Sequence, residues 1–200
     1  MLVDRWRLLV ADESGFTLPE LVTSMAILLT IMAGFTGLLV STSRAELDMN
    51  NRFAARNEAQ LGFSKLRREV HCAISGVTAT GVPATPQRAT LTLAAACPTA
   101  AAGTVVSWCT VLDGTGRYGL WRYVGAACSG TGVKVADYVS APPGWTTLVG
   151  APNPPFTDID QTTTSLAKLG VNLYVNVTPT KPATRFRIQD DLVLRNSTRT

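Results

Sequence analysis

Histidine and closely spaced cysteines are scarce in this chain of 200 residues. His71 is its one histidine, and its four cysteines form no Cys-x-x-Cys pair. A structural zinc site takes cysteine and histidine ligands at short spacings, whereas successive cysteines here are 25, 12 and 19 residues apart. We therefore expect no zinc centre. His71 is expected to be a structural or exposed residue rather than a catalytic base.

Nucleophile motifs are missing too. Ser129, in the stretch CSGTG, lacks the first glycine of a nucleophile elbow. Two carboxylate pairs, Asp158 with Asp160 and Asp190 with Asp191, are weak calcium candidates, because neither has the ligand number of an EF-hand loop. The expected function is therefore not enzymatic and requires no cofactor.

Basic residues form no dense run, and the formal net charge is only +4. A mildly basic charge spread over a surface is ordinary. A nucleic-acid site would need a clustered basic strip and an aromatic side chain that stacks on bases. The candidates for it are Arg117, Arg122, Lys134, Arg185 and Arg187, with Trp108 or Trp121 for stacking.

One apolar run dominates the N-terminal region. Residues Leu21–Val40 include no Lys, Arg, Asp, Glu or His. At ~1.5 Å rise per residue, such a helix spans the ~30 Å hydrocarbon core of a bilayer. Glu20 precedes it, and a carboxylate in a span costs roughly 2.5–3.5 kcal/mol, so it requires a partner. Arg5 and Arg7 favour a cytoplasmic N-terminus.

Two ordinary interpretations of this run remain open. A secretory signal would have a basic start, a shorter apolar core and small residues at the cut, which Ser41–Ser43 provide only faintly. A single-span surface protein that is never cleaved fits the length but leaves the position of Glu20 unexplained.

The stretch Gly15–Val40, GFTLPELVTSMAILLTIMAGFTGLLV, resembles the class III signal of type IV prepilins and type II secretion pseudopilins. The resemblance implies that a prepilin peptidase cuts after Gly15 and N-methylates Phe16. It also implies that Glu20 pairs with the free amine of a neighbouring subunit, because opposite charges offset each other's burial cost. Pro19 departs from the usual aliphatic residue, but proline is tolerated in a first helical turn.

The resemblance implies a structural subunit, a minor pilin or pseudopilin, of a type IV pilus-like or type II secretion filament. Its expected partners are prepilin peptidase, other pilin or pseudopilin subunits, membrane lipid before assembly and, indirectly, a platform protein and an ATPase. A DNA-binding minor pilin of an uptake pilus is the alternative. The expected location is the inner membrane, with one span, a cytoplasmic N-terminus and an exported C-terminal domain that reaches the filament or cell surface after assembly.

The helix is expected to continue beyond the membrane, to about Ala73. Apolar residues recur there at three- and four-residue spacing, which is the pattern of an amphipathic helix on a core: Ala55, Ala59, Phe63, Leu66 and Val70. The charged residues between them are expected to face solvent: Arg56, Lys65, Arg67, Arg68 and Glu69. Gly34 and Gly37 are a candidate hinge, or small residues for close helix packing.

The composition after Ala73 is typical of strands and loops. We expect strands at 89–96, 104–110 and 117–124, a tight turn at 113–116 and a closing hairpin of 166–178 with 183–195. A proline-rich surface loop is expected at 141–155. The segments RYGLWRYV, VKVADYV and LVLRNS further resemble J-type minor pseudopilins and minor pilins.

The expected fold class is α+β and pilin-like, with one long N-terminal helix packed on a small antiparallel sheet. The helix would have a membrane-spanning half and an amphipathic half. The expected divisions are a leader at 1–15, a membrane and filament-core helix at 16–40 and an exported domain at 41–200.

Four cysteines beyond the span, Cys72, Cys97, Cys109 and Cys128, predict two disulfides in an oxidising compartment. Three pairings are possible. In a three-strand meander, Cys97 and Cys128 fall at one end of the sheet and Cys109 at the other. This favours the pairs Cys97–Cys128 and Cys72–Cys109.

Overall fold

The computed structural model describes residues 15–79, 87–95, 97–98, 101, 103–113, 117–144, 148, 151, 153–159, 165–178, 181 and 184–197. Residues 1–14, the tip of the expected turn at 114–116 and Asp160 lie outside this part of the chain, as do the side chains of Asp158 and Ile159.

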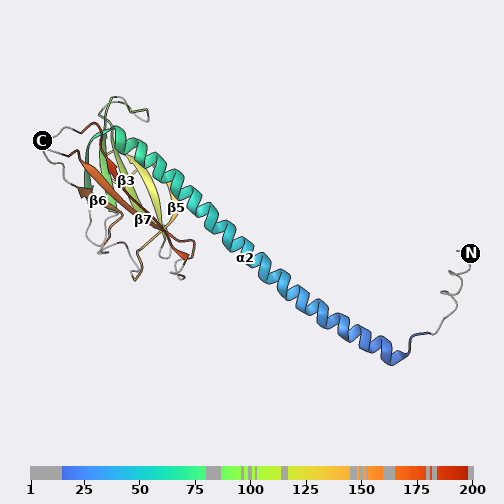
Figure 1. The fold of residues 1–200 in the computed structure, drawn as a ribbon. Helices are drawn as coiled ribbons and strands as arrows, with labels where there is room; N and C mark the ends of the chain where they lie inside the picture. Colours follow the sequence, from blue (N-terminus) through green and yellow to red (C-terminus); the bar gives the residue numbers. More distant parts are fainter. Residues whose placement is uncertain are drawn as a thin grey trace, which may run out of the picture. The chain divides into compact units, whose positions relative to one another are not determined.

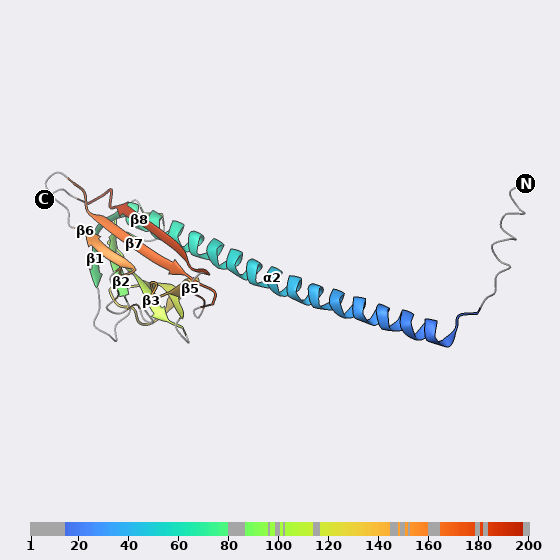
Figure 2. The same cartoon turned by 60° about the horizontal axis from the view of Figure 1, so that its bottom comes forward.

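One helix is followed by eight strands in the described residues (Figures 1 and 2). The elements are α2 (Leu18–Cys72), β1 (Ala73–Ala79), β2 (Gln87–Leu93), β3 (Val105–Leu112), β4 (Arg117–Val124), β5 (Gly132–Ser140), β6 (Phe156–Ile159), β7 (Lys168–Val175) and β8 (Phe186–Val193). The chain divides into two compact units, one ending at Asp48 and the other beginning at Met49. The second unit contains the whole sheet and the C-terminal part of α2.

The strands form one antiparallel sheet in the order β1-β2-β3-β4-β5-β7. Strand β8 pairs with β7 over its full length. Strand β6 pairs with residues 168–171 of β7, and β5 pairs with Val175 and Tyr174. Since a strand has two edges, β5 and β6 share one edge of β7 and β8 takes the other. The result is the α+β, pilin-like layout expected from the sequence.

The predicted stripe of α2 is the surface that packs on this sheet. All five of its residues are buried: Ala55, Ala59, Phe63, Leu66 and Val70. They meet side chains from several strands, among them Trp108, Leu120 and Val175. At Gly62 a built Cβ would lie 3.2 Å from the Cβ of Ala136, so helix and sheet approach closely there. The three- and four-residue spacing therefore identified the packed face correctly.

Five of the eight strands were expected from alternation and turn signals: β2, β3, β4, β7 and β8. The strand β1 was not expected, because its seven residues include Gly76 and Ser75 and most of its side chains are exposed or half-buried. Strands β5 and β6 were also missed as strands. The proline-rich segment is more than a surface loop, since Ala141, Leu148 and Ala151 are buried.

The favoured disulfide pairing is wrong. The bonds are Cys72–Cys97 and Cys109–Cys128, with Cα–Cα distances of 5.5 and 6.0 Å. The unexpected strand β1 begins directly after the helix, at Ala73. Ala73 pairs with Leu93, which places the helix end beside the end of β2. Cys97 follows β2 there and is within reach of Cys72.

The second bond depends on where Cys109 lies in its strand. Cys109 is in the middle of β3, opposite Trp121 of β4, rather than at a strand end. The chain turns back after β4, because the Gly125 N–H donates to the Val105 carbonyl and the Gly125 carbonyl accepts from the Ser107 hydroxyl. Cys128 follows this turn and forms the disulfide bond with Cys109. Sequence spacing showed neither the extra strand nor the returning turn.

Replacement of Leu66 by alanine should destabilise the domain by about 2–5 kcal/mol, because the side chain is 0% exposed and its removal leaves a cavity. The matched control is Leu61→Ala on the same helix, where the side chain is 63% exposed and the change should be within about 0.5 kcal/mol. Denaturant unfolding of both full-length variants in the same detergent measures the difference. Equal losses would contradict the assigned helix face.

Candidate functional site

The expected cleavage point lies just before the helix. Residues 15–17 are not helical, α2 begins at Leu18, and the Phe16 side chain is 76% exposed. The Thr17 carbonyl accepts from the N–H groups of Glu20 (3.0 Å) and Leu21 (3.1 Å). Pro19 therefore sits in the first turn, where its missing N–H removes no helical hydrogen bond. A peptide bond in exposed, non-helical backbone is one that a peptidase can reach.

The segment that follows has the properties of a membrane span. Within the described residues, α2 is the one helix long and apolar enough to cross a bilayer, and none of its most apolar 18-residue window is buried. Its hydroxyl groups bond to carbonyls three or four residues earlier, in Thr23, Ser24, Thr30, Thr36, Ser41 and Thr42. Because unsatisfied polar groups are costly in hydrocarbon, this arrangement suits lipid.

Glu20 is the single charged residue at the start of this span. Glu20 is exposed, and no described residue forms an ion pair with its carboxylate. A carboxylate in the first turn is favoured by the helix dipole by about 0.3–1 kcal/mol. That is less than the insertion cost of a charge, so the helix dipole alone does not offset the cost of a charged Glu20 in the span.

Gly34 and Gly37 lie inside the uninterrupted helix α2. A Cβ built at either position meets no atom within 4 Å, so both glycines border open space in the described part of the chain. Loosening of the helix at Gly34–Gly37 on assembly stays a prediction. The alternative is close packing of a second helix against these small residues, and the space around both glycines would allow it.

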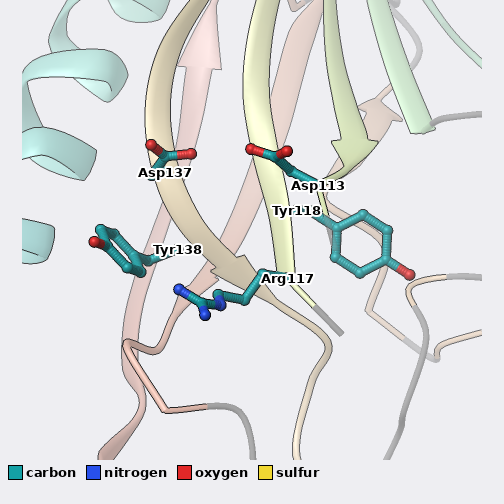
Figure 3. A pocket seen from close by; sticks show the side chains of 5 residues that line it. All are labelled: Asp113, Arg117, Tyr118, Asp137 and Tyr138. Carbon is teal, nitrogen blue, oxygen red and sulfur yellow. The ribbon is translucent and has the colours of Figure 1, made fainter. Parts of the chain in front are cut away.

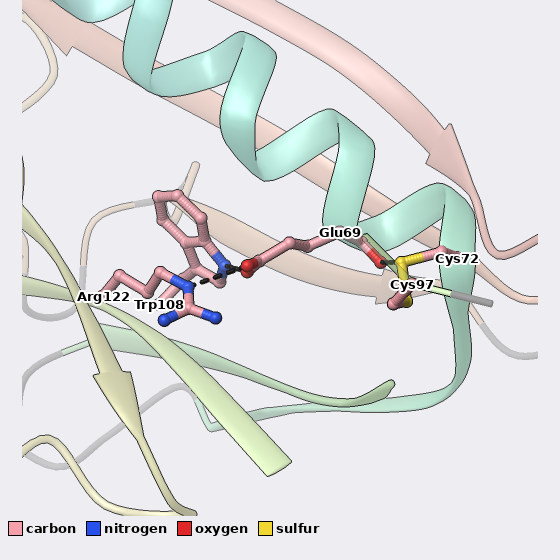
Figure 4. A network of polar contacts seen from close by, with 5 residues as sticks. All are labelled: Glu69, Cys72, Cys97, Trp108 and Arg122. Atoms are coloured by element: carbon pink, nitrogen blue, oxygen red, sulfur yellow. Dashed lines mark hydrogen bonds and ion pairs between the residues drawn. A yellow bond between two sulfur atoms is a disulfide. The ribbon is translucent and has the colours of Figure 1, made fainter. Parts of the chain in front are cut away.

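Glu69 is not the solvent-facing residue that the sequence suggested. It is 2% exposed and lies between the helix and the sheet (Figure 4). Its Oε2 accepts from the Trp108 indole N–H at 2.8 Å, and its Oε1 accepts from the Arg122 Nε–H at 2.8 Å. Helical spacing could not reveal this, because both donors come from strands distant in sequence. A buried carboxylate needs such partners, since an unpaired one would be strongly destabilising.

The opposite flank of the helix end is tied to β8 and the segment after it. Arg67 pairs with Asp190, and the His71 Nδ1 lies 2.9 Å from the Val193 carbonyl oxygen. The Asn196 amide donates to the Cys72 carbonyl at 3.0 Å. The end of α2 is therefore held by polar contacts on both flanks and by a disulfide.

The carboxylates considered for calcium do not gather. Asp190 bonds to Arg67, and the Asp190 Oδ1 also accepts from the Asp191 N–H at 2.9 Å. The side chains of Asp158 and Asp160 are outside the described part. Among the residues that are described, no group of three His, Cys, Asp or Glu side chains is placed to hold a metal.

Arg122 and Lys134 of the candidate basic strip form ion pairs within the domain. Trp108 is fully buried and Arg122 faces Glu69, while Lys134, opposite Trp121, binds Asp113 and Asp137. The hydrogen bonds to Asp113 and then Asp137 raise the pKa of Lys134 above 10.5, so it stays charged at neutral pH.

A hollow of about 130 Å³ beside this lysine is lined by Asp113, Arg117, Tyr118, Asp137 and Tyr138 (Figure 3). Both of its carboxylates already bind Lys134, and the Arg117 guanidinium lies over the Tyr138 ring, 5.7 Å from the centroid. The hollow therefore presents charges that are satisfied within the domain.

Comparisons of this chain with protein-family models, with curated proteins and with solved structures found no match. The residues and the fold therefore carry the functional argument. A long apolar helix followed by a disulfide-bonded domain indicates a single span with an exported domain.

Substitution of Glu69 by glutamine should cost about 3–5 kcal/mol of unfolding free energy, because it leaves the Arg122 guanidinium uncompensated beside the core. The same substitution at the half-buried Glu58, on the same helix, is the control and should change little. Chemical denaturation followed by circular dichroism measures both. A loss at Glu69 no larger than at Glu58 would show that the ion pair contributes nothing to docking of the helix.

Proposed function

We propose that this protein is a structural subunit, a minor pilin or pseudopilin, of a type IV pilus-like or type II secretion filament. The observation that carries the proposal is the start of α2: an exposed Gly15–Phe16 bond, a lone carboxylate at Glu20 and an uncharged span whose hydroxyls are satisfied internally. The attached pilin-like domain supports the same role.

Prepilin peptidase, acting on the cytoplasmic side, would cut after Gly15 and methylate the new amine of Phe16. The amine then carries a positive charge at the edge of the apolar segment. Glu20 of a neighbouring subunit is a suitable anion for it, because each charge lowers the cost of burying the other. The charge pair would set the register between neighbouring helices.

Assembly would exchange lipid contacts of the span for contacts with other helices. Apolar side chains lose little in this exchange, because lipid tails and neighbouring helices are similarly apolar. Exposed residues of the span, such as Leu29 and Leu38, would then be covered by other subunits. An ATPase and a platform protein would supply the work of extraction from the membrane.

The N-terminal peptide of the protein from its own cells should begin at Phe16 and be heavier by one methyl group. Gly15→Ala should abolish this peptide, because the peptidase recognises the glycine before the cut. Mass spectrometry of the N-terminus measures both. Ser14→Ala, one residue earlier, is the control and should be processed normally. A chain that retains its first residues, or one that starts after Ser43, would overturn the proposal.

Glu20→Gln should leave membrane insertion and processing intact but lower the assembled fraction by at least about tenfold, because it preserves shape and removes the charge. Thr23→Val is the matched control on the next turn, since its hydroxyl bonds only within the helix. The assembled fraction is measured by shearing and sedimentation of filaments. Normal assembly of the Glu20 variant would exclude the charge pair as its determinant.

A further inference from the structure

A hollow of about 110 Å³ lies on the face of the sheet opposite to α2, where β6, β7 and β8 run side by side (Figure 2). On β8, Asp190 bonds to Arg67 of the helix and Leu192 is buried, so the alternate residues face away from the helix. The residues of the hollow that carry the argument are Thr157, Gly170, Asn172, Arg187, Gln189 and Asp191. All of them belong to the second compact unit.

Gly170 forms the floor of this hollow. It pairs with Thr157 of β6 on one side and with Asp191 of β8 on the other. A Cβ built on Gly170 would overlap the Thr157 Oγ1 and lie 3.5 Å from the Asp191 Oδ1, so both oxygens lie over the same glycine. Glycine inside a strand often marks a place where a ligand or another group approaches closely. A larger residue here would displace the Thr157 hydroxyl and fill the hollow.

Three polar side chains at the hollow have no hydrogen-bond partner within the described part of the chain. They are the Thr157 hydroxyl, the Gln189 amide and the Asp191 carboxylate, and all three residues are exposed. They come from two strands and border one hollow. Together they provide a hydroxyl, an amide and a carboxylate, which between them both donate and accept hydrogen bonds.

Arg187 is held in a fixed orientation at the edge of the hollow. The Asn172 Oδ1 accepts from the Arg187 Nε–H at 2.8 Å, and the Asn172 amide donates to the Asn153 carbonyl at 3.3 Å. The guanidinium lies over the Tyr174 ring, 5.4 Å from its centroid. Its terminal nitrogens are bonded to no described residue. Asn172 and Tyr174 therefore orient a paired donor that remains available to a ligand.

The charges and the length of the hollow favour an uncharged ligand with many hydroxyl groups. Arg187 and Asp191 contribute one charge of each sign, so an ion attracted by one would be repelled by the other. They are four residues apart on β8, or ~13 Å at ~3.3 Å per residue. A ligand that bonds to all these groups must carry donors and acceptors along a comparable length. Two linked sugar rings have this property.

We propose that this hollow binds an uncharged saccharide. Neighbouring hydroxyls of one ring would bond to the paired nitrogens of Arg187, and those of the next ring to Thr157 and Asp191. Gln189, which is opposite Asn172 on the neighbouring strand, would contact the linkage between the rings. Paired hydroxyls match the two donors of a guanidinium and the two acceptors of a carboxylate. The site goes beyond the filament role, because none of its residues comes from α2.

Binding of the full-length protein to a printed array of neutral oligosaccharides tests the proposal. The protein is kept in a detergent without a sugar headgroup, which could compete for the hollow. At least one neutral glycan should bind, and its Kd is then measured by surface plasmon resonance. Asp191→Ala and Thr157→Val should each raise this Kd by at least about tenfold, because each removes bonds to the ligand. Absence of any bound neutral glycan overturns the proposal.

Matched variants separate lost binding from lost folding. Glu46→Ala removes an exposed carboxylate far along the sequence and should leave the Kd unchanged. Circular dichroism should show that the Asp191 and Thr157 variants unfold at the same denaturant concentration as the unmodified protein, because both residues are exposed. If either variant is destabilised, Gln189→Ala, at a third exposed residue, replaces it. Unchanged Kd values in the correctly folded variants overturn the assignment of the site.

Salt dependence separates a saccharide site from a site for anions. The Kd should change less than about twofold between ~0.05 and ~0.5 M NaCl, because the ligand carries no charge to be screened. Sialylated and sulfated glycans on the same array should bind no better than their neutral counterparts. Binding of charged glycans alone, or a Kd that rises tenfold with salt, overturns the proposal. The N-terminal mass of the sample is measured independently, so failure of either proposal leaves the other intact.

Discussion

The structure depends on one constraint, which is that a single helix must satisfy two different surroundings. From Leu21 to Val40 the helix is apolar on all sides, and none of its most apolar window is covered by the domain. From Ala55 onward it has one buried face and one polar face. The first part needs lipid or other helices around it, and the second needs the sheet. Since α2 is continuous, membrane segment and domain belong to one element.

The junction of helix and sheet combines polar and covalent restraints. Glu69 binds Trp108 and Arg122 on one flank, and Arg67 binds Asp190 on the other. The Cys72–Cys97 bond closes the end. These polar contacts restrain both flanks of the helix end.

Local patterns predicted the parts of the fold whose signals are local. The apolar spacing of α2 and the alternation of β4 are properties of neighbouring residues, so the buried face and the strand followed from them. Strand β1 has no such pattern in its own residues. It is held in the sheet by its pairing with β2, which lies further along the chain. The wrong disulfide pairing followed from that missed strand and from the missed turn after β4. Long-range pairing thus decided which cysteines met.

The sequence by itself determined the apolar span and the lone carboxylate at Glu20, because hydropathy and charge along a chain set its behaviour in a bilayer. Only the tertiary structure decided the burial of Glu69 and the pairing of the cysteines. Each of these needs residues from separate strands to meet at a few ångströms. The register between paired strands brings these residues together, and the spacing of residues along the chain does not encode that register.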